Sequence, residues 1–172
     1  REKELGSIVN LQVTPVTRTE FMLGKQAPYV ALGMVNFGLM TLLAVTVFGV
    51  PVTGSFLLLV LASLLFVMFA TGFGLLASTF TRSQIAAMFV TLVGTMIPAI
   101  QYAGLINPVA SLEGAGRLVG EIHPATYVFT ISRGVFNKAL GFADLDRTLV
   151  PIALSVPIVL ALAIAFLKKQ DR

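Results

Sequence analysis

Long uncharged, apolar segments dominate this chain and are separated by shorter polar ones. Residues 26–81 contain no Asp, Glu, Lys, Arg or His, and residues 83–112 contain none either. A helix needs about 20 apolar residues to cross the roughly 30 Å hydrocarbon core of a bilayer. The expected transmembrane helices are residues 28–50, 55–78, 84–105 and 148–167. Barrel strands are about ten residues long and alternate in polarity, so the pattern predicts an all-α, polytopic membrane protein with four spans.

The polar segment at residues 1–27 has the pattern of a bent elbow that leads into the first span. The residue before a proline is disfavoured in the α region, so Pro15 should end a short helix over about residues 2–13. Thr17 and Glu20 then have the spacing of a capping box, which predicts that a second helix starts directly after Thr17. The apolar face of the short helix fits either lipid headgroups or a soluble partner.

The second polar segment, residues 107–147, predicts two short amphipathic helices. The first carries charged residues every four positions, a spacing at which ion pairs form, and the second starts after Pro124 with polar residues along one face. Each is about 10–16 residues long, too short to cross a bilayer. We expect a re-entrant or interfacial hairpin, and a solvated loop with surface helices is the alternative. The candidate residues of this hairpin are Glu113, Arg117, Glu121, Tyr127 and Arg133.

The distribution of positive charge predicts the orientation of the chain. With four spans, both termini lie on the same side of the membrane. Of the 12 Lys and Arg residues, four lie on the side opposite the termini: Arg117, Arg133, Lys138 and Arg147. The side with more Lys and Arg usually faces the cytoplasm. We therefore expect a cytoplasmic elbow and an external hairpin.

The composition argues against most catalytic and metal-binding chemistry. The chain has no Cys, and its only histidine, His123, is interpreted as a polar interfacial residue. No Gly-rich loop followed by Lys and Ser or Thr is present, which argues against nucleotide binding by this chain. No charged residue lies at the centre of a span, which disfavours a proton- or sodium-driven transporter. We expect no enzyme and no cofactor in this chain, and energy supplied by another domain or subunit.

The elbow resembles the cytoplasmic segment of ABC-2 type membrane permeases. That segment has an acidic–basic–acidic start, a Gly followed by Thr or Ser, a Thr-Pro or Ser-Pro pair, and a helix ending in Gly-Lys. The matching residues here are Glu2-Lys3-Glu4, Gly6-Ser7, Thr14-Pro15 and Gly24-Lys25. Residues 102–136 (YAGLINPVASLEGAGRLVGEIHPATYVFTISRGVF) look like the external hairpin of the same family. The similarity is greatest to the membrane part of the fused ribosome-associated ATPase type.

The resemblance covers nearly the whole chain and departs from the family in length. ABC-2 permease units usually have six spans, and residues 1–172 would form a single membrane-domain fragment that holds the last four. The chain also begins at Arg1 and not at Met. We therefore expect it to be part of a longer protein whose first two spans lie upstream.

The resemblance also implies partners. Residues 2–13 would be the coupling helix, which docks in a groove of an ATP-binding cassette subunit or domain that holds ATP and Mg²⁺. A second permease protomer would complete a dimer in the bacterial inner membrane, the hairpin would close the outer end of the pathway between the protomers, and no direct contact with nucleic acid is implied. The candidate partner-binding residues are Glu2, Glu4, Gly6, Leu11, Thr14 and Pro15.

Two functions fit this resemblance. The first is an exporter permease that couples ATP hydrolysis on a partner cassette to efflux of a lipophilic or amphipathic substrate. The second is a membrane anchor for a ribosome-associated ATPase that transports nothing. The spans offer only apolar surface with scattered Ser and Thr, so the sequence does not identify a substrate.

Overall fold

A computed structural model describes residues 17–81 and 83–169 of the chain. All regular secondary structure within these two ranges is helical. The stretches that are long and apolar enough to cross a membrane are Thr19–Thr46, Phe56–Phe80, Gln84–Gln101 and Phe142–Phe166. The structure confirms the prediction of a polytopic helical membrane protein. The short elbow helix predicted for residues 2–13 lies outside the described residues.

The spans differ in how continuous they are. The three unbroken long helices are α1 (Arg18–Thr46), α2 (Phe56–Phe80) and α7 (Phe142–Lys169). The third span is built from α3 (Gln84–Thr91), the π-helix η2 (Leu92–Met96) and α4 (Ile97–Gln101). The connection from the third span to α7 contains the 3-10 turn η3 (Val109–Ser111), α5 (Gly114–Ile122) and α6 (Pro124–Asn137).

Two of the spans begin earlier than the uncharged segments predict. α1 starts directly after Thr17, as the capping-box spacing predicted, so Pro28, the expected first residue of the span, lies inside the helix. α7 starts at Phe142 and not at residue 148, and its first turn contains Asp144. A capping side chain satisfies the free N–H groups of a first turn, and an acidic residue there is stabilised by the partial positive charge of the helix N-terminus. The first turns of α1 and α7 therefore lie outside the uncharged segments, which mark only the apolar part of each helix.

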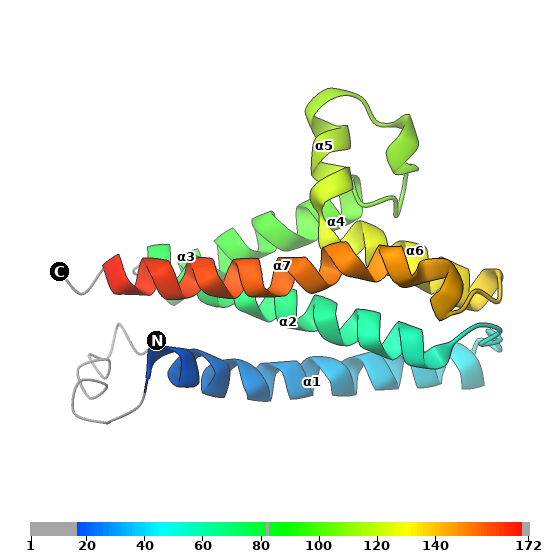
Figure 1. Ribbon diagram of the computed structural model, residues 1–172, viewed down its shortest axis with the longest axis horizontal. Helices are drawn as coiled ribbons and strands as arrows, with labels where there is room; N and C mark the ends of the chain where they lie inside the picture. Colours follow the sequence, from blue (N-terminus) through cyan, green and yellow to red (C-terminus); the bar gives the residue numbers. More distant parts are fainter. Residues whose placement is uncertain (1–16, 82, 170–172) are drawn as a thin grey trace.

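α2 is the central helix of the molecule. It contacts α1, α3, α6 and α7, and Figure 1 shows α1, α2 and α7 lying lengthwise beside one another. The start of α1 and the end of α7 lie at the same end of the molecule, which we call the terminal end (Figure 1). The loop between α1 and α2, the end of α6 and the start of α7 lie at the opposite end, which we call the loop end.

α6 is part of the main hydrophobic core. Its residues Ile131 and Val135 are fully buried. The core combines Leu58, Leu59 and Ala62 from α2, Ile131 and Val135 from α6, and Leu145 and Ile152 from α7. Figure 1 shows α6 lying along α7 in the half of the molecule nearest the loop end. α6 therefore belongs to the helical body, in contrast to the solvated loop considered as an alternative.

The third span packs mainly on α2 and exposes much of its surface. No residue of α3, η2 or α4 is buried. The two come close together at Gly94 of η2, where a Cβ atom would lie 2.5 Å from the ring of Phe73 on α2. Exposed side chains such as Phe89 and Met96 are apolar, as expected for helices whose outer surface faces hydrocarbon.

The loop between α1 and α2 holds the C-terminal end of α6. Gly54 N donates to Val135 O at 2.8 Å, and Ser55 N donates to Leu140 O at 3.1 Å. The Thr53 hydroxyl also donates to Val135 O, at 3.0 Å. The bonds to Val135 O satisfy a carbonyl of the type that the last turn of a helix leaves without a partner, and the bond to Leu140 O holds the chain that follows α6. We call these five residues the loop clasp.

Substituting Gly54 by Ala is expected to destabilise the fold by about 1–3 kcal/mol, the usual cost of overpacking. A Cβ atom at Gly54 would lie 2.4 Å from Leu140 O and 2.9 Å from Val135 Cα, and backbone atoms cannot rotate away. Thermal unfolding in detergent micelles measures the change. The control is Gly24→Ala, because a Cβ atom there meets nothing within 4 Å. Equal unfolding temperatures for the two variants would contradict the prediction.

Candidate functional site

A capping box fixes the start of α1. Thr17 N and Oγ1 donate to Glu20 Oε2 at 2.9 Å and 2.8 Å, and Glu20 N donates to Thr17 Oγ1 at 3.3 Å. These bonds satisfy N–H groups that the first helical turn leaves free. α1 therefore begins at a defined point within the predicted elbow. The partner-binding candidates Glu2, Glu4, Gly6, Leu11, Thr14 and Pro15 lie outside the described residues.

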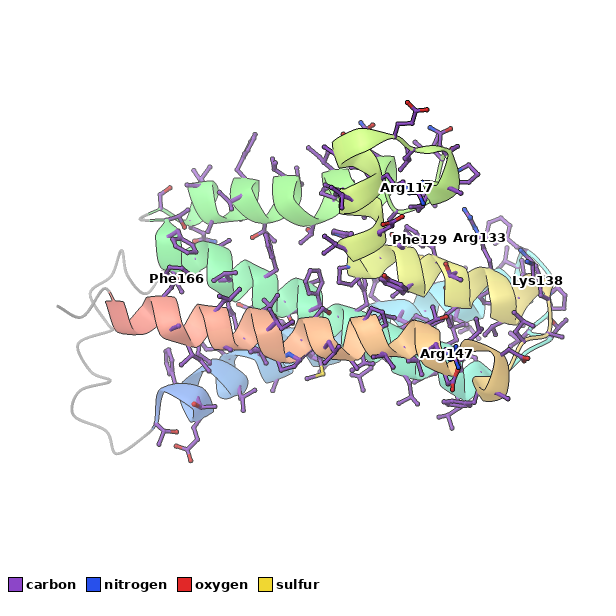
Figure 2. All side chains as sticks on the ribbon, turned by 45° about the horizontal axis from the view of Figure 1, so that its top comes forward. Arg117, Phe129, Arg133, Lys138, Arg147 and Phe166 are labelled. Atoms are coloured by element: carbon purple, nitrogen blue, oxygen red, sulfur yellow. The ribbon has the colours of Figure 1, made fainter. Side chains whose placement is uncertain are left out.

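α5 carries one ion pair and projects across the direction of the spans (Figure 1). Arg117 Nε donates to Glu121 Oε1 at 2.8 Å, and both side chains are exposed. Glu113 lies before the helix as its N-cap residue and makes no side-chain bond to it. The predicted row of charges is therefore a single pair, of a kind that contributes about 0.3–0.5 kcal/mol. Figure 2 places Arg117 on this projecting helix.

α5 rests on Tyr102 through two glycines. A Cβ atom at Gly120 would lie 2.4 Å from Tyr102 O, and one at Gly116 would lie 3.2 Å from the Tyr102 ring. Leu118 and Ile122 stay exposed, at 60% and 75%. The glycines thus allow α5 to cross the end of the third span at close range, while its larger apolar side chains remain on the outside.

Side chains of α6 satisfy the last carbonyl groups of α5. The Thr126 hydroxyl donates to Gly120 O, and the Tyr127 hydroxyl donates to Glu121 O. The last turn of a helix leaves its carbonyls without partners, and a buried carbonyl without a hydrogen bond is costly. Tyr127, a predicted hairpin residue, therefore fixes the corner between α5 and α6.

His123 lies at this corner and is buried, whereas the sequence suggested an interfacial residue. Its side chain is 8% exposed, and its ring meets that of Phe69 edge to face, with centroids 6.0 Å apart. His123 Nδ1 accepts a hydrogen bond from Ala125 N at 3.3 Å, so the proton of the neutral imidazole is on Nε2. Burial lowers the pKa of this imidazole because desolvation disfavours the charged form. His123 is therefore a neutral cap of α6.

Arg133 joins α6 to the chain that follows the third span. Its Nη2 donates to Gly104 O at 2.6 Å and to Leu105 O at 3.4 Å. Figure 2 shows the Arg133 side chain extending from α6 toward the loop that precedes α5. Gly104 has a φ of +82°, a conformation that glycine adopts without strain. Because hydrogen bonds from a charged donor are the stronger ones, Arg133 fixes this loop against α6.

Four of the predicted hairpin residues thus take part in one connected arrangement. Arg117 pairs with Glu121, the carbonyl of Glu121 accepts from Tyr127, and Arg133 on the same helix as Tyr127 holds the loop before α5. Glu113 does not belong to it. The two helices do not lie side by side as a hairpin, because α5 projects away from the bundle and α6 runs along it (Figure 1).

Gln26 is a buried polar residue that the sequence analysis did not single out. Its side chain is 2% exposed, and Nε2 donates to Met68 O at 2.7 Å and to Thr71 Oγ1 at 3.0 Å. In the sequence, Gln26 directly follows Lys25, the last charged residue of the elbow. By that pattern alone it would be assigned to the polar segment that flanks the first span. The signal that could have found it is its spacing from Met22 and Gly33, since positions four and seven residues apart share one helix face.

The arrangement of these residues is mechanical in character. Within residues 17–81 and 83–169, no group of three or more His, Cys, Asp or Glu side chains could hold a metal ion. The described residues form hydrogen bonds between helices. The loop clasp joins the α1–α2 loop to the end of α6, Tyr127 joins α6 to α5, and Gln26 joins α1 to α2.

The unfolding temperature is expected to fall from neutral to mildly acidic pH partly because of His123. Its pKa is lower in the folded chain than in the unfolded one, so the unfolded chain binds a proton first as the pH drops below about 6.5. The variant His123→Asn keeps an acceptor for the helix cap but does not titrate. Its unfolding temperature in detergent should depend less on pH than that of the wild type. Parallel pH curves for the two proteins would contradict this assignment.

Comparison with known proteins identifies relatives of the whole chain. A family model described as ABC-2 type transporter matches residues 1–137. The probable multidrug ABC transporter permease YbhS of Escherichia coli K12 is 36% identical over 167 residues, which is 97% of this chain and 40% of that protein. The probable multidrug ABC transporter permease YbhR of the same strain is 25% identical over 138 residues, 80% of this chain and 37% of the relative. The inner membrane transport permease YhhJ, also from this strain, is 27% identical over 143 residues, 83% of this chain and 38% of the relative.

No solved structure gives a significant match to the chain. The chain spans about 40% of the length of YbhS and 37% of that of YbhR. The family match covers the elbow, the first three spans, α5 and α6, which include both segments that carry the resemblance seen in the sequence. The chain belongs to the ABC-2 type transporter family.

Proposed function

We propose that this chain is part of a permease that uses ATP hydrolysed by a partner cassette to export a lipophilic or amphipathic compound. The family makes the chain a membrane component of a transporter, and such permeases act with an ABC ATPase. YbhS and YbhR are named as probable multidrug permeases, which supports a substrate of this class. Because the chain covers 40% of YbhS, transport is proposed as an activity of a longer protein.

The observation that carries the coupling part of this proposal is that α1 is one continuous helix beginning at the elbow. It starts at the capping box of Thr17 and continues for 29 residues to Thr46. At a rise of 1.5 Å per residue, such a helix is roughly 44 Å long. A displacement of the elbow by a cassette would therefore be transmitted along a single stiff element to the loop end.

We also propose that the terminal end faces the cytoplasm and the loop end faces outward. The excess of Lys and Arg on the side of the termini supports this orientation. In that orientation, α6 lies in the outer half of the membrane domain, with its C-terminal end held by the loop clasp. α6 would then contribute to closing the outer end of a pathway formed with a second protomer.

Proteoliposomes that contain the full-length permease and its cassette partner provide the test of function. A panel of fluorescent lipophilic cations, anions and neutral amphiphiles is offered in the presence of ATP and Mg²⁺. We expect ATP-dependent transport of at least one compound, together with stimulation of the ATPase by that compound. If the cassette hydrolyses ATP but no compound is moved and none changes the rate, the export proposal fails and the anchoring function takes its place.

Substituting Pro for Leu11 is expected to uncouple ATP hydrolysis from transport. Proline removes a backbone N–H and costs about 3 kcal/mol inside a helix, so it should break the predicted coupling helix. ATPase and transport are measured in the same vesicles, and insertion is measured as the amount of permease in the membrane fraction. The matched control is Leu11→Ala, which keeps the helix. Transport by the proline variant equal to that by the alanine variant would refute a coupling role for this segment.

A cysteine introduced at Ser7 is expected to be protected from a membrane-impermeant thiol reagent in intact cells and labelled after lysis. The described chain contains no native Cys, so within these 172 residues the probe is unique. The matched control is Lys138→Cys, because Lys138 is exposed at the loop end (Figure 2). This control should be labelled in intact cells. The reverse pattern of labelling would place the elbow outside the cell, where no cassette could reach it.

A further inference from the structure

Gln26 is a polar side chain of α1 that is bonded directly to α2. The Gln26 amide donates to Met68 O at 2.7 Å and to Thr71 Oγ1 at 3.0 Å. Thr71 is itself held, because its hydroxyl donates to Val67 O at 2.7 Å. Hydrogen bonds between helices in an apolar environment hold the helices together and fix their relative position. At this level α1 and α2 are therefore joined by a chain of directional bonds in addition to apolar packing.

Three helices meet closely around this amide. A Cβ atom at Gly72 of α2 would lie 3.3 Å from Val159 Cγ1 and 3.5 Å from Leu160 Cδ2 of α7, and 3.7 Å from Gln26 Nε2 of α1. One turn before Gln26, Met22 is only 3% exposed. The absence of a side chain at Gly72 lets α7 approach α2 beside the amide. A movement of α1 at this point is therefore resisted by α2, and α2 is held in turn by its contacts with α7.

Beyond this junction α1 is less enclosed. Gly33 lies against Val67 of α2 and Phe37 packs on the main core, but Asn36 and Leu39 are exposed. The amide of Gln26 lies near the start of α1, ahead of most of the helix. It is therefore in a position where a push on the elbow can be passed to another span.

We propose that Gln26 is a positioning residue that locks α1 to α2, so that displacement of the elbow moves both helices as one unit. This inference rests on the proposed function, because it concerns how the elbow acts. Without the lock, α1 would be able to shift along α2, and part of the displacement would not reach α6 and α7, which pack on α2. Gln26 acts through other residues and touches neither substrate nor nucleotide in this proposal.

The variant Gln26→Leu separates coupling from stability. Leucine has similar bulk, and it removes both the two hydrogen bonds and the carbonyl oxygen Oε1, which is buried and unpaired within the described residues. The Thr71 hydroxyl still reaches Val67 O and Met68 O, so the substitution leaves no newly unsatisfied polar group on α2. The unfolding temperature in detergent should therefore stay within error. The amount of substrate moved per ATP hydrolysed should fall several-fold in proteoliposomes with the full-length permease and its cassette.

The matched control is Asn36→Leu, which removes an exposed amide from the same helix. Its transport per ATP should equal that of the wild type. Unchanged transport per ATP in the Gln26 variant would overturn the proposal. A fall in the unfolding temperature that accompanies the loss of transport in that variant would also overturn it, because Gln26 would then serve only the fold.

A second measurement does not depend on transport. Gly33→Cys on α1 and Val67→Cys on α2, two positions that contact each other and leave Gln26 and Thr71 unchanged, are combined in a full-length permease without other cysteines. The pair is joined by a short bifunctional thiol reagent. If α1 and α2 move as one unit, the rate of cross-linking should be the same with the cassette empty and with a non-hydrolysable ATP analogue. The cross-linked permease should also retain transport, measured against the two single-cysteine variants treated with the same reagent.

The outcomes of this experiment are distinct from those that test the function itself. A nucleotide-dependent change in the cross-linking rate, or a block of transport that thiol reduction reverses, would show that α1 slides past α2 and would overturn the lock. Failure of the wild type to transport any compound would remove the export function, yet the cross-linking rates would still report whether the two helices move together.

Discussion

The structure depends on one constraint: a backbone N–H or C=O group in an apolar environment must find its hydrogen-bond partner within the protein. Long helices meet this constraint along their length but not at their ends. This chain has several helix ends within its body, at α4, α5 and α6. Each receives a donor from elsewhere: Arg133 reaches the carbonyls after α4, Tyr127 reaches the end of α5, and the loop clasp reaches the end of α6.

The same bonds determine how the elements are joined. α6 begins at the neutral cap His123 and ends at the loop clasp, and between these points Ile131 is buried against α2 and α7. A short helix fastened at both ends and along one face cannot move independently of the body. The third span is attached more loosely. Its Gly94 packs against the ring of Phe73 of α2, and Arg133 of α6 is bonded to the loop that follows the span. The molecule therefore combines a firmly bonded body with one less enclosed span.

For a family whose permeases act with an ATPase, the path of force through the membrane domain is the central physical question. Displacement passes efficiently through contiguous packed or hydrogen-bonded elements. α2 is bonded to α1 through Gln26 in one half of the molecule and packs on α6 and α7 in the other. It is thus the element through which events at the terminal end and the loop end are connected.

The sequence by itself determined the four membrane helices, the capping box at Thr17 and the start of α6 at Pro124, because each depends on composition or spacing within a few neighbouring residues. It also indicated the pair of Arg117 and Glu121. Only the tertiary structure decided that His123 is buried, that Gln26 faces α2 and that α6 enters the core. These features depend on which helix faces which at a given depth. In a chain whose helices are apolar on all sides, the pattern of polar residues leaves that choice open, and close packing around small residues such as Gly72 and Gly120 makes it.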